Sequence, residues 1–387
     1  MARAYLDHHA TTPVDPRVVE AMAPYWDRAF GNSASAHIFG WEAKEAIEKA
    51  RAQVAELVRC KPGEISFTSG ATEADNLAIL GSAPRLAHRG RHFVTSAIEH
   101  PAVLDALRQL EKRGAELSVL GVDSDGRVSA AELKATLRDD TVLCSVMWAN
   151  NEIGTIQPIE EISAVCKERG VVLHSDAVQA VGRIPVNADT VDMLSLTAHK
   201  IYGPKGIGAL VVRRRKPRIH LQPLLYGGGH QDGLRPGTLP VPLIVGLGEA
   251  CALAKAEERA RREHVQVLRD HLLQRLRREI EDLGVNGSLR DRLPGNLNVC
   301  IRGVEAEALL LELREVAAST GSACSSTEHS PSSVLLALGL SPDEAHASIR
   351  FGIGKDNTIE EIDAVCDALV TKVEALRSFS RHDSRGG

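Results

Sequence analysis

Short apolar segments alternate with helix-period stretches along most of this 387-residue chain, from about Thr12 to Ala250. The apolar segments share a length of five to ten residues and many β-branched side chains: 64–68, 92–96, 116–120, 142–147, 171–176, 191–200 and 208–212. Strands separated by helices in this way usually pair in parallel, with helices on both faces of the sheet. The sequence therefore predicts an α/β fold.

The rest of the chain has a different pattern. A charged helix-period stretch at about 253–283 is followed by apolar segments at 297–301 and 348–352 and a helical pattern at 305–315. These features predict a smaller α+β domain. We expect residues 12–255 to form the large domain, 1–11 with 256–376 to form the small one, and the polar tail 377–387 to be disordered.

Composition excludes several classes of protein. The formal net charge of −5 argues against nucleic-acid binding, which usually needs a basic surface. No apolar run approaches the ~20 residues that span a bilayer, and the N-terminus has no signal-peptide core, so we expect a cytoplasmic protein without membrane contact. The seven cysteines are odd in number and widely scattered. They indicate neither a disulfide framework nor a metal site.

Asp176 and Lys200 end two successive strand-like segments. Ligands of α/β sheets bind at the carboxyl ends of the strands. A lysine there can form a Schiff base with pyridoxal phosphate, and an aspartate can keep the pyridine nitrogen protonated. The alternative is that both residues simply end strands at the surface.

Three further segments follow predicted strands. In Thr68–Leu77 a small-residue turn leads into a helix, which suits a phosphate, although Ser69 or Thr72 could be an ordinary helix cap. His100 could stack on a cofactor ring and relay protons, but a lone histidine is more often structural. Asn150-Asn151, or Gln179, could donate to a phenolic oxygen, although asparagine is also common in turns.

Two candidates lie in the predicted small domain. Cys324 stands in a long run of small and polar residues, 317–333, unlike the other six cysteines, which have apolar or helical neighbours. Such a connection inside a compact domain is usually functional or disordered. Arg350 could clamp a carboxylate with its planar guanidinium, or could pair with a nearby acid.

Taken together, these residues resemble the cysteine desulfurases of the NifS/IscS type, in the class V aminotransferase family. The resemblance extends from Tyr5 to about residue 370. Its most specific pieces are Thr68-Ser69-Gly70-Ala71-Thr72-Glu73, Asn150-Asn151-Glu152-Ile153-Gly154, His199-Lys200-Ile201-Tyr202-Gly203-Pro204-Lys205-Gly206, Gly227-Gly228-Gly229-His230, Gly237-Thr238 and Gly321-Ser322-Ala323-Cys324. It implies the fold type I architecture of pyridoxal phosphate enzymes, with a large, mixed, mostly parallel seven-stranded sheet and a smaller C-terminal α+β domain.

The resemblance also implies roles for individual residues. Lys200 would carry the cofactor, Asp176 would bind its ring nitrogen, His100 would stack on the ring as acid and base, and Gln179 would donate to the phenolic oxygen. The predicted phosphate ligands are Ala71, Thr72, Thr197 and His199, completed by Thr238 of a second subunit in a homodimer. Asn151 and Arg350 would hold the carboxylate of L-cysteine.

Cys324 would accept the sulfur as a persulfide and pass it to an acceptor, such as an iron–sulfur scaffold protein or a thiolation enzyme. No metal site is implied beyond a transient contact of Cys324 with an iron–sulfur cluster. The neighbouring alternatives are a selenocysteine lyase or a small-substrate aminotransferase, although a transaminase needs no thiol. A non-catalytic sulfur-carrier subunit is a further alternative, but it would need neither Lys200, Asp176 nor His100.

Overall fold

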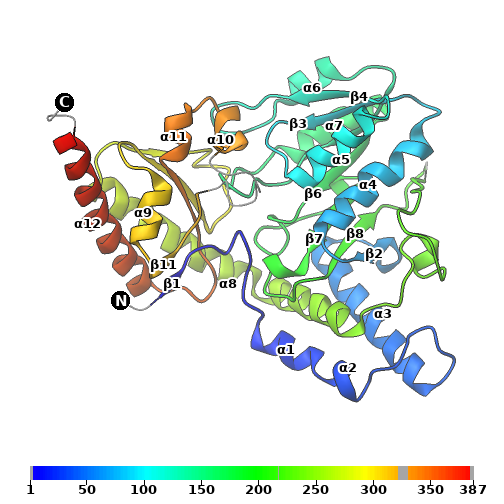
Figure 1. Ribbon diagram of the computed structural model, residues 1–387. Coiled ribbons are helices and arrows are strands. Elements are labelled where there is room, and N and C mark those ends of the chain that lie inside the picture. Colours follow the sequence, from blue (N-terminus) through cyan, green and yellow to red (C-terminus); the bar gives the residue numbers. More distant parts are fainter. Residues whose placement is uncertain (1–2, 217, 321–329, 384–387) are drawn as a thin grey trace.

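A seven-stranded sheet forms the centre of the larger part of the molecule (Figure 1). The computed structural model describes residues 3–216, 218–320 and 330–383. In spatial order the strands are β2 (Ile65–Thr68), β8 (Gly208–Val212), β7 (Met193–Thr197), β6 (Val172–Asp176), β5 (Thr141–Ser145), β3 (His92–Ser96) and β4 (Glu116–Leu120). β7, β6, β5, β3 and β4 pair in parallel, and β8 runs antiparallel between β7 and β2. The predicted α/β fold with a mixed, mostly parallel sheet is confirmed.

Successive side chains of these strands enter two different cores. Phe93, Leu143 and Leu210 pack on one face with residues of α4 (Ala71–Leu86) and α5 (Pro101–Glu111). Their neighbours Val94 and Cys144 pack on the other face. That face is covered by α3 (Ile38–Val58), α6 (Ala130–Thr136), α7 (Ile159–Arg169) and the first half of α8 (Val241–Glu279). The alternation follows from the two-residue period of a strand.

A separate core lies in the smaller part of the molecule, on the left of Figure 1. Its three-stranded antiparallel sheet has the order β12 (Ser348–Gly352), β10 (Asn296–Ile301) and β9 (Leu283–Val285). Near it, the N-terminal β1 (Ala4–Tyr5) pairs in parallel with β11 (Val316–Ala317). The remaining helices there are α9 (Ala306–Glu312), α10 (Ser333–Ala337), α11 (Pro342–His346) and α12 (Ile359–Asp383). The first residues of the chain thus lie beside its last third.

The 39-residue helix α8 joins the two parts. Ile244 and Leu247 belong to the core of the large sheet, and Leu272 and Leu276 to the core of the small one. The short helices α1 (Pro16–Met22) and α2 (Pro24–Asp27) lead from β1 to α3. Among the described residues, no helix is both long and apolar enough to cross a membrane.

Two predicted boundaries need correction. The charged helix begins at Val241, 12 residues before the expected start at 253. The last helix continues to Asp383, so residues 377–383, predicted to be disordered, are helical. Arg377 gives the physical reason, because its Nη2 donates to the carbonyls of Glu281 and Arg302 at 3.0 and 2.6 Å and so ties this part of the helix to the small sheet.

Candidate active site

The carboxyl ends of the parallel strands bring the predicted residues to one edge of the large sheet. Asp176 is the last residue of β6, and Lys200 ends the 3-10 turn Ala198–Lys200 after β7. His100 follows β3 and caps α5. Asn151 lies in the turn that follows β5. Strands that point the same way end at the same edge, so residues far apart in the sequence meet there.

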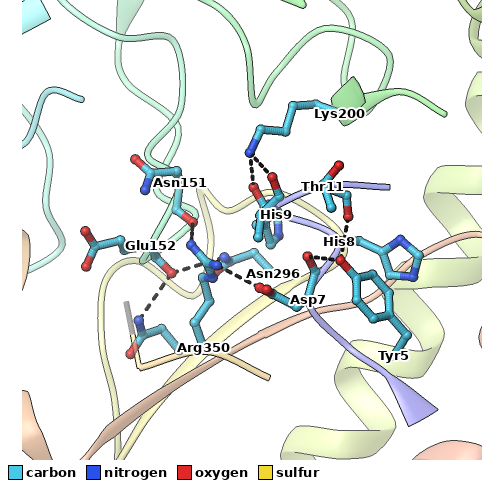
Figure 2. A network of polar contacts seen from close by, with 12 residues as sticks. Tyr5, Asp7, His8, His9, Thr11, Asn151, Glu152, Lys200, Asn296 and Arg350 are labelled. Carbon is cyan, nitrogen blue, oxygen red and sulfur yellow. Dashed lines mark hydrogen bonds and ion pairs between the residues drawn. The ribbon is translucent and has the colours of Figure 1, made fainter. Parts of the chain in front are cut away.

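Lys200 reaches across to the N-terminal segment. Its Nζ donates to the carbonyl oxygens of His9 and Ala10 at 2.5 and 2.6 Å (Figure 2). Two backbone carbonyls thus hold the amine where the edge of the large sheet meets the N-terminal segment. The structure therefore shows the amine at the strand edge where the sequence predicted it.

Asp176 is almost fully buried, and its Oδ1 accepts a hydrogen bond from the backbone N–H of Val178 at 2.9 Å. Burial raises the pKa of Asp176, whereas the charges of His100 and Lys200 lower it. A cation placed against this carboxyl would hold it ionised. Asp176 can thus hold a protonated ring nitrogen.

His100 has one ring nitrogen in use. Its Nδ1 accepts from the backbone N–H of Ala102 at 3.1 Å, as a helix N-cap. When the ring is neutral its proton therefore lies on Nε2. Burial lowers the pKa of His100, which favours the neutral form. A neutral imidazole with a donor at Nε2 suits both ring stacking and proton transfer.

The N-terminus of α4 comes close to the large sheet. Thr68 Oγ1 donates to the carbonyl of Gly70 at 2.8 Å, and the Glu73 carboxylate accepts from Ser69 N at 2.6 Å. A Cβ at Gly208 of β8 would lie 2.8 Å from the backbone of Gly70. Only glycine at 208 lets this turn pack against the strand. The first N–H groups of a helix have no partner within that helix, so those of α4 can bind an anion.

The other predicted phosphate ligands occupy different surroundings. Ala71 is half-buried and Thr72 exposed in the first turn of α4. Thr197 Oγ1 donates to Ile207 O at 3.1 Å, and His199 Nδ1 lies 3.1 Å from Thr11 Oγ1. Burial lowers the pKa of His199 to about 4, so its ring is neutral. Thr238 is exposed between β8 and α8, and its role at a second subunit stays a prediction.

Arg350 of β12 closes the site from the small sheet. It is 3% exposed, its Nη2 contacts Asp7 at 2.7 Å, and its Nη1 donates to the carbonyl of Asn151 at 3.0 Å (Figure 2). Glu152, which follows Asn151 in the chain, accepts a hydrogen bond from Ser332 Oγ at 2.5 Å. Burial raises the pKa of Glu152 to about 7. Arg350 therefore lies against the backbone of Asn151, and Cys324 lies outside the described residues.

Sequence reasoning missed several site residues. His9 and Arg183 surround Gln179: its Oε1 accepts from Arg183 Nη1 at 2.9 Å, and its Nε2 donates to His9 O at 3.0 Å. Asp75 Oδ1 lies 3.5 Å from His174 Nε2, and both residues are buried. Burial raises the pKa of Asp75 well above its usual range. In the sequence, the only signal for these residues is a charged residue type within an otherwise apolar segment.

These residues fit pyridoxal phosphate on chemical grounds. The edge of the large sheet holds the buried carboxyl of Asp176 for a ring nitrogen, the amine of Lys200 for an aldehyde and the neutral imidazole of His100 for stacking. The N-terminus of α4, which packs closely on Gly208, is available for a phosphate. Gln179 keeps one of its two amide hydrogens for an oxygen acceptor, because the other donates to His9 O. Each group matches one chemical feature of the cofactor.

Comparisons with known proteins find relatives along nearly the whole chain. Residues 4–365 match the family model of aminotransferase class-V. "Cysteine desulfurase IscS" of Anaeromyxobacter dehalogenans (strain 2CP-C) is 52% identical over 379 residues, covering 97% of this chain and 94% of the relative. A solved structure entitled "NIFS-LIKE PROTEIN" is 36% identical with a TM-score of 0.89, covering 97% of this chain and all of that one. "SspA in complex with cysteine" is 37% identical with a TM-score of 0.81, covering 92% of this chain and all of that one. The chain therefore belongs to the class V aminotransferase family.

Proposed function

We propose that this protein is a pyridoxal phosphate-dependent cysteine desulfurase, which converts L-cysteine to L-alanine and leaves the sulfur as a persulfide on Cys324. The observation that carries the proposal is the meeting of Asp176, Lys200 and His100 at one edge of the large sheet, with Arg350 of the small sheet bound to the turn that contains Asn151. Relatives named cysteine desulfurase that span nearly the whole chain support it.

The large sheet supplies the residues for the cofactor. Bound there, pyridoxal phosphate would supply an electron-withdrawing ring that stabilises negative charge at the α-carbon of the substrate. Asp176 would bind the ring nitrogen, His100 the ring face and Gln179 the phenolic oxygen. Ala71, Thr72, Thr197 and His199 would hold the phosphate. Thr238 of a second subunit would complete that site in a homodimer.

The amine of Lys200 would act as the base. After it is released from the cofactor, it would remove the α-proton of the substrate. Its hydrogen bonds to the carbonyls of His9 and Ala10 give it neutral partners between steps. Arg350 would meet the substrate carboxylate with its charge and Asn151 with its amide, which fixes the α-carbon relative to the amine.

The Cys324 thiolate would then attack the sulfur of the substrate. A sulfur–sulfur bond forms as the carbon–sulfur bond breaks, and the electron pair of that bond stays with the three-carbon fragment. The fragment takes up protons and leaves as L-alanine, and the persulfide sulfur passes to an acceptor protein. The thiolate form is needed because a thiol is a poor nucleophile.

Product release from L-cysteine tests the proposal. Purified protein loaded with pyridoxal phosphate and supplied with a reductant should release alanine and sulfide in equal amounts. Cys324→Ala should release neither, while its visible spectrum still responds to L-cysteine. A wild type that releases no product although its spectrum changes with L-cysteine would contradict the proposal. The same assay with L-selenocysteine separates the desulfurase from a selenocysteine lyase.

A further inference from the structure

The imidazole of His9 is buried inside the candidate site, with 2% of the residue exposed. Its backbone carbonyl accepts from the amine of Lys200 at 2.5 Å, and Figure 2 shows it between Lys200 and Arg350. A polar atom buried to this extent normally has a hydrogen-bond partner: a protein group, an ordered water or a ligand.

Arg183 fixes the proton of this ring. Its Nη1 contacts Nδ1 of His9 and also donates to Oε1 of Gln179 at 2.9 Å. A guanidinium nitrogen can only donate, so Nδ1 must accept and the proton of the neutral ring must lie on Nε2. Nδ1 of His9 and Oε1 of Gln179 are also within hydrogen-bond distance, at 2.9 Å. Because an amide oxygen can only accept, a bond between them would need the proton on Nδ1, the position to which Arg183 Nη1 donates.

The charge state of His9 agrees with this tautomer. Burial lowers the pKa of His9 well below its usual range, and the charges of Arg183, Arg350 and Lys200 lower it further. The ring is therefore neutral at physiological pH. It carries one donor, at Nε2, and one acceptor, at Nδ1.

The Cδ2 side of the ring lies against the end of β12. A Cβ added to Gly352 would lie 2.8 Å from Cδ2 of His9, the carbon bonded to Nε2. Gly352 and Arg350 are two positions apart on the same strand, so their side-chain directions share one face. Nε2 of His9 and Nε of Arg350 are both buried, and neither has a hydrogen-bond partner within residues 3–216, 218–320 and 330–383.

We propose that His9 is a substrate-binding residue whose Nε2–H donates to the carboxylate of the bound amino acid, beside the guanidinium of Arg350. The inference rests on the proposed function and adds a second donor to its carboxylate site. A carboxylate has two oxygens, so one can accept from Arg350 and the other from His9. A neutral donor also adds no further positive charge next to Lys200, whose amine must lose its proton to act as a base.

The tautomer can be read directly from the wild type. The holoenzyme is labelled with ¹⁵N-histidine, and the His9 signals are assigned from their loss in His9→Asn. We expect the shifts of a neutral ring protonated at Nε2 from about pH 6 to about pH 9. A ring protonated at Nδ1, or a ring that titrates within this range, would overturn the proposal.

Two small thiols then separate the carboxylate contact from other effects. 3-Mercaptopropionate has the carboxylate of cysteine but no amine, and cysteamine has the amine but no carboxylate. Inhibition constants of both are measured for wild type, His9→Asn and His9→Gln.

His9→Asn should weaken the binding of 3-mercaptopropionate by about tenfold and leave the binding of cysteamine unchanged, because it removes a hydrogen bond to a charged group. His9→Gln, whose longer amide reaches toward the Nε2 position, should lose less. Equal losses for both thiols, or no loss, would contradict the proposal.

His8→Asn is the matched control, because the ring of the neighbouring His8 packs edge-on against Tyr5, with the ring centroids 4.9 Å apart. It should keep the wild-type ratio of the two inhibition constants. If His9→Asn does not fold, the wild-type tautomer decides the question, with the signals assigned from His9→Gln. The two proposals can fail separately. If the wild type releases no alanine but His9→Asn still weakens the binding of 3-mercaptopropionate alone, the desulfurase function is contradicted and the His9 contact is supported.

Discussion

Arg350 and Asp7, 343 positions apart in the chain, form an ion pair of 2.7 Å. The guanidinium is 3% exposed and also donates to the carbonyl of Asn151, in the turn after β5. The N-terminal segment, the large sheet and the small sheet therefore meet at one buried charge. A buried charge needs such partners, because removing it from water is costly.

Asp7→Asn should lower the stability of the folded protein more than it affects catalysis. The amide still offers an oxygen to Arg350 but removes the negative charge, so we expect the free energy of unfolding to fall by about 1–3 kcal/mol. Urea denaturation measures it, with Asp27→Asn as control because Asp27 is 76% exposed beside Arg28. Equal stabilities of the two variants would show that the buried pair contributes no more than a surface pair.

Glu99→Gln should flatten the dependence of stability on pH. Burial raises the pKa of Glu99 to about 8, so the folded state keeps a proton that the unfolded chain releases near its ordinary pKa. Stability therefore falls as the pH rises from about 5 to about 8. Glutamine resembles the protonated acid and keeps Oε1 as acceptor for Ser96 Oγ at 2.5 Å and Met147 N at 2.8 Å.

Between these two pH values the wild type should lose on the order of 3 kcal/mol more than Glu99→Gln, at about 1.4 kcal/mol per pKa unit. Denaturant unfolding at both ends of the range measures this difference. Glu168→Gln is the control, because Glu168 is exposed and pairs with Lys134 at the surface. Parallel pH profiles of wild type and Glu99→Gln would mean that Glu99 is ionised in the folded protein.

The residues at strand ends could be predicted from the sequence, and their partners could not. Asp176, Lys200 and His100 each follow an apolar segment, and the parallel order of strands then brings them to one edge. His9 and Arg183 have no such local signal, because their contact joins positions 174 apart. Asp75 likewise becomes informative only once α4 packs over His174.

The missed start of α8 has a local reason. Residues 241–252 lack a Ser, Thr, Asp or Asn cap before them and contain a proline at the second position. Pro240 precedes the helix and Pro242 lies in its first turn, where its missing N–H costs nothing. Two prolines so close together are more typical of a loop, so the first turns of α8 were not predicted.

Asp176→Asn should lower kcat with little change in KM. Asparagine can still accept from Val178 N, but its second group donates where the carboxylate would accept from a protonated ring nitrogen. Loss of this charge at the reacting centre should lower kcat by about 100-fold or more. Asp192→Asn is the control, because Asp192 Oδ2 also accepts a backbone N–H, from Leu173 at 3.0 Å, at the opposite end of β6. A normal kcat in Asp176→Asn would exclude Asp176 from the ring nitrogen.

Gly208→Ala should weaken binding of the cofactor without removing any predicted ligand. The new Cβ would lie 2.6 Å from Leu196 O and 2.8 Å from the backbone of Gly70, so the turn before α4 must move away from the sheet. A shift of the N-terminal amides should raise the dissociation constant of pyridoxal phosphate about tenfold, equal to about 1.4 kcal/mol. Equilibrium dialysis measures it, and Gly121→Ala is the matched control because a Cβ there meets no heavy atom within 4 Å. If both variants bind the cofactor as tightly as the wild type, the phosphate does not sit at the N-terminus of α4.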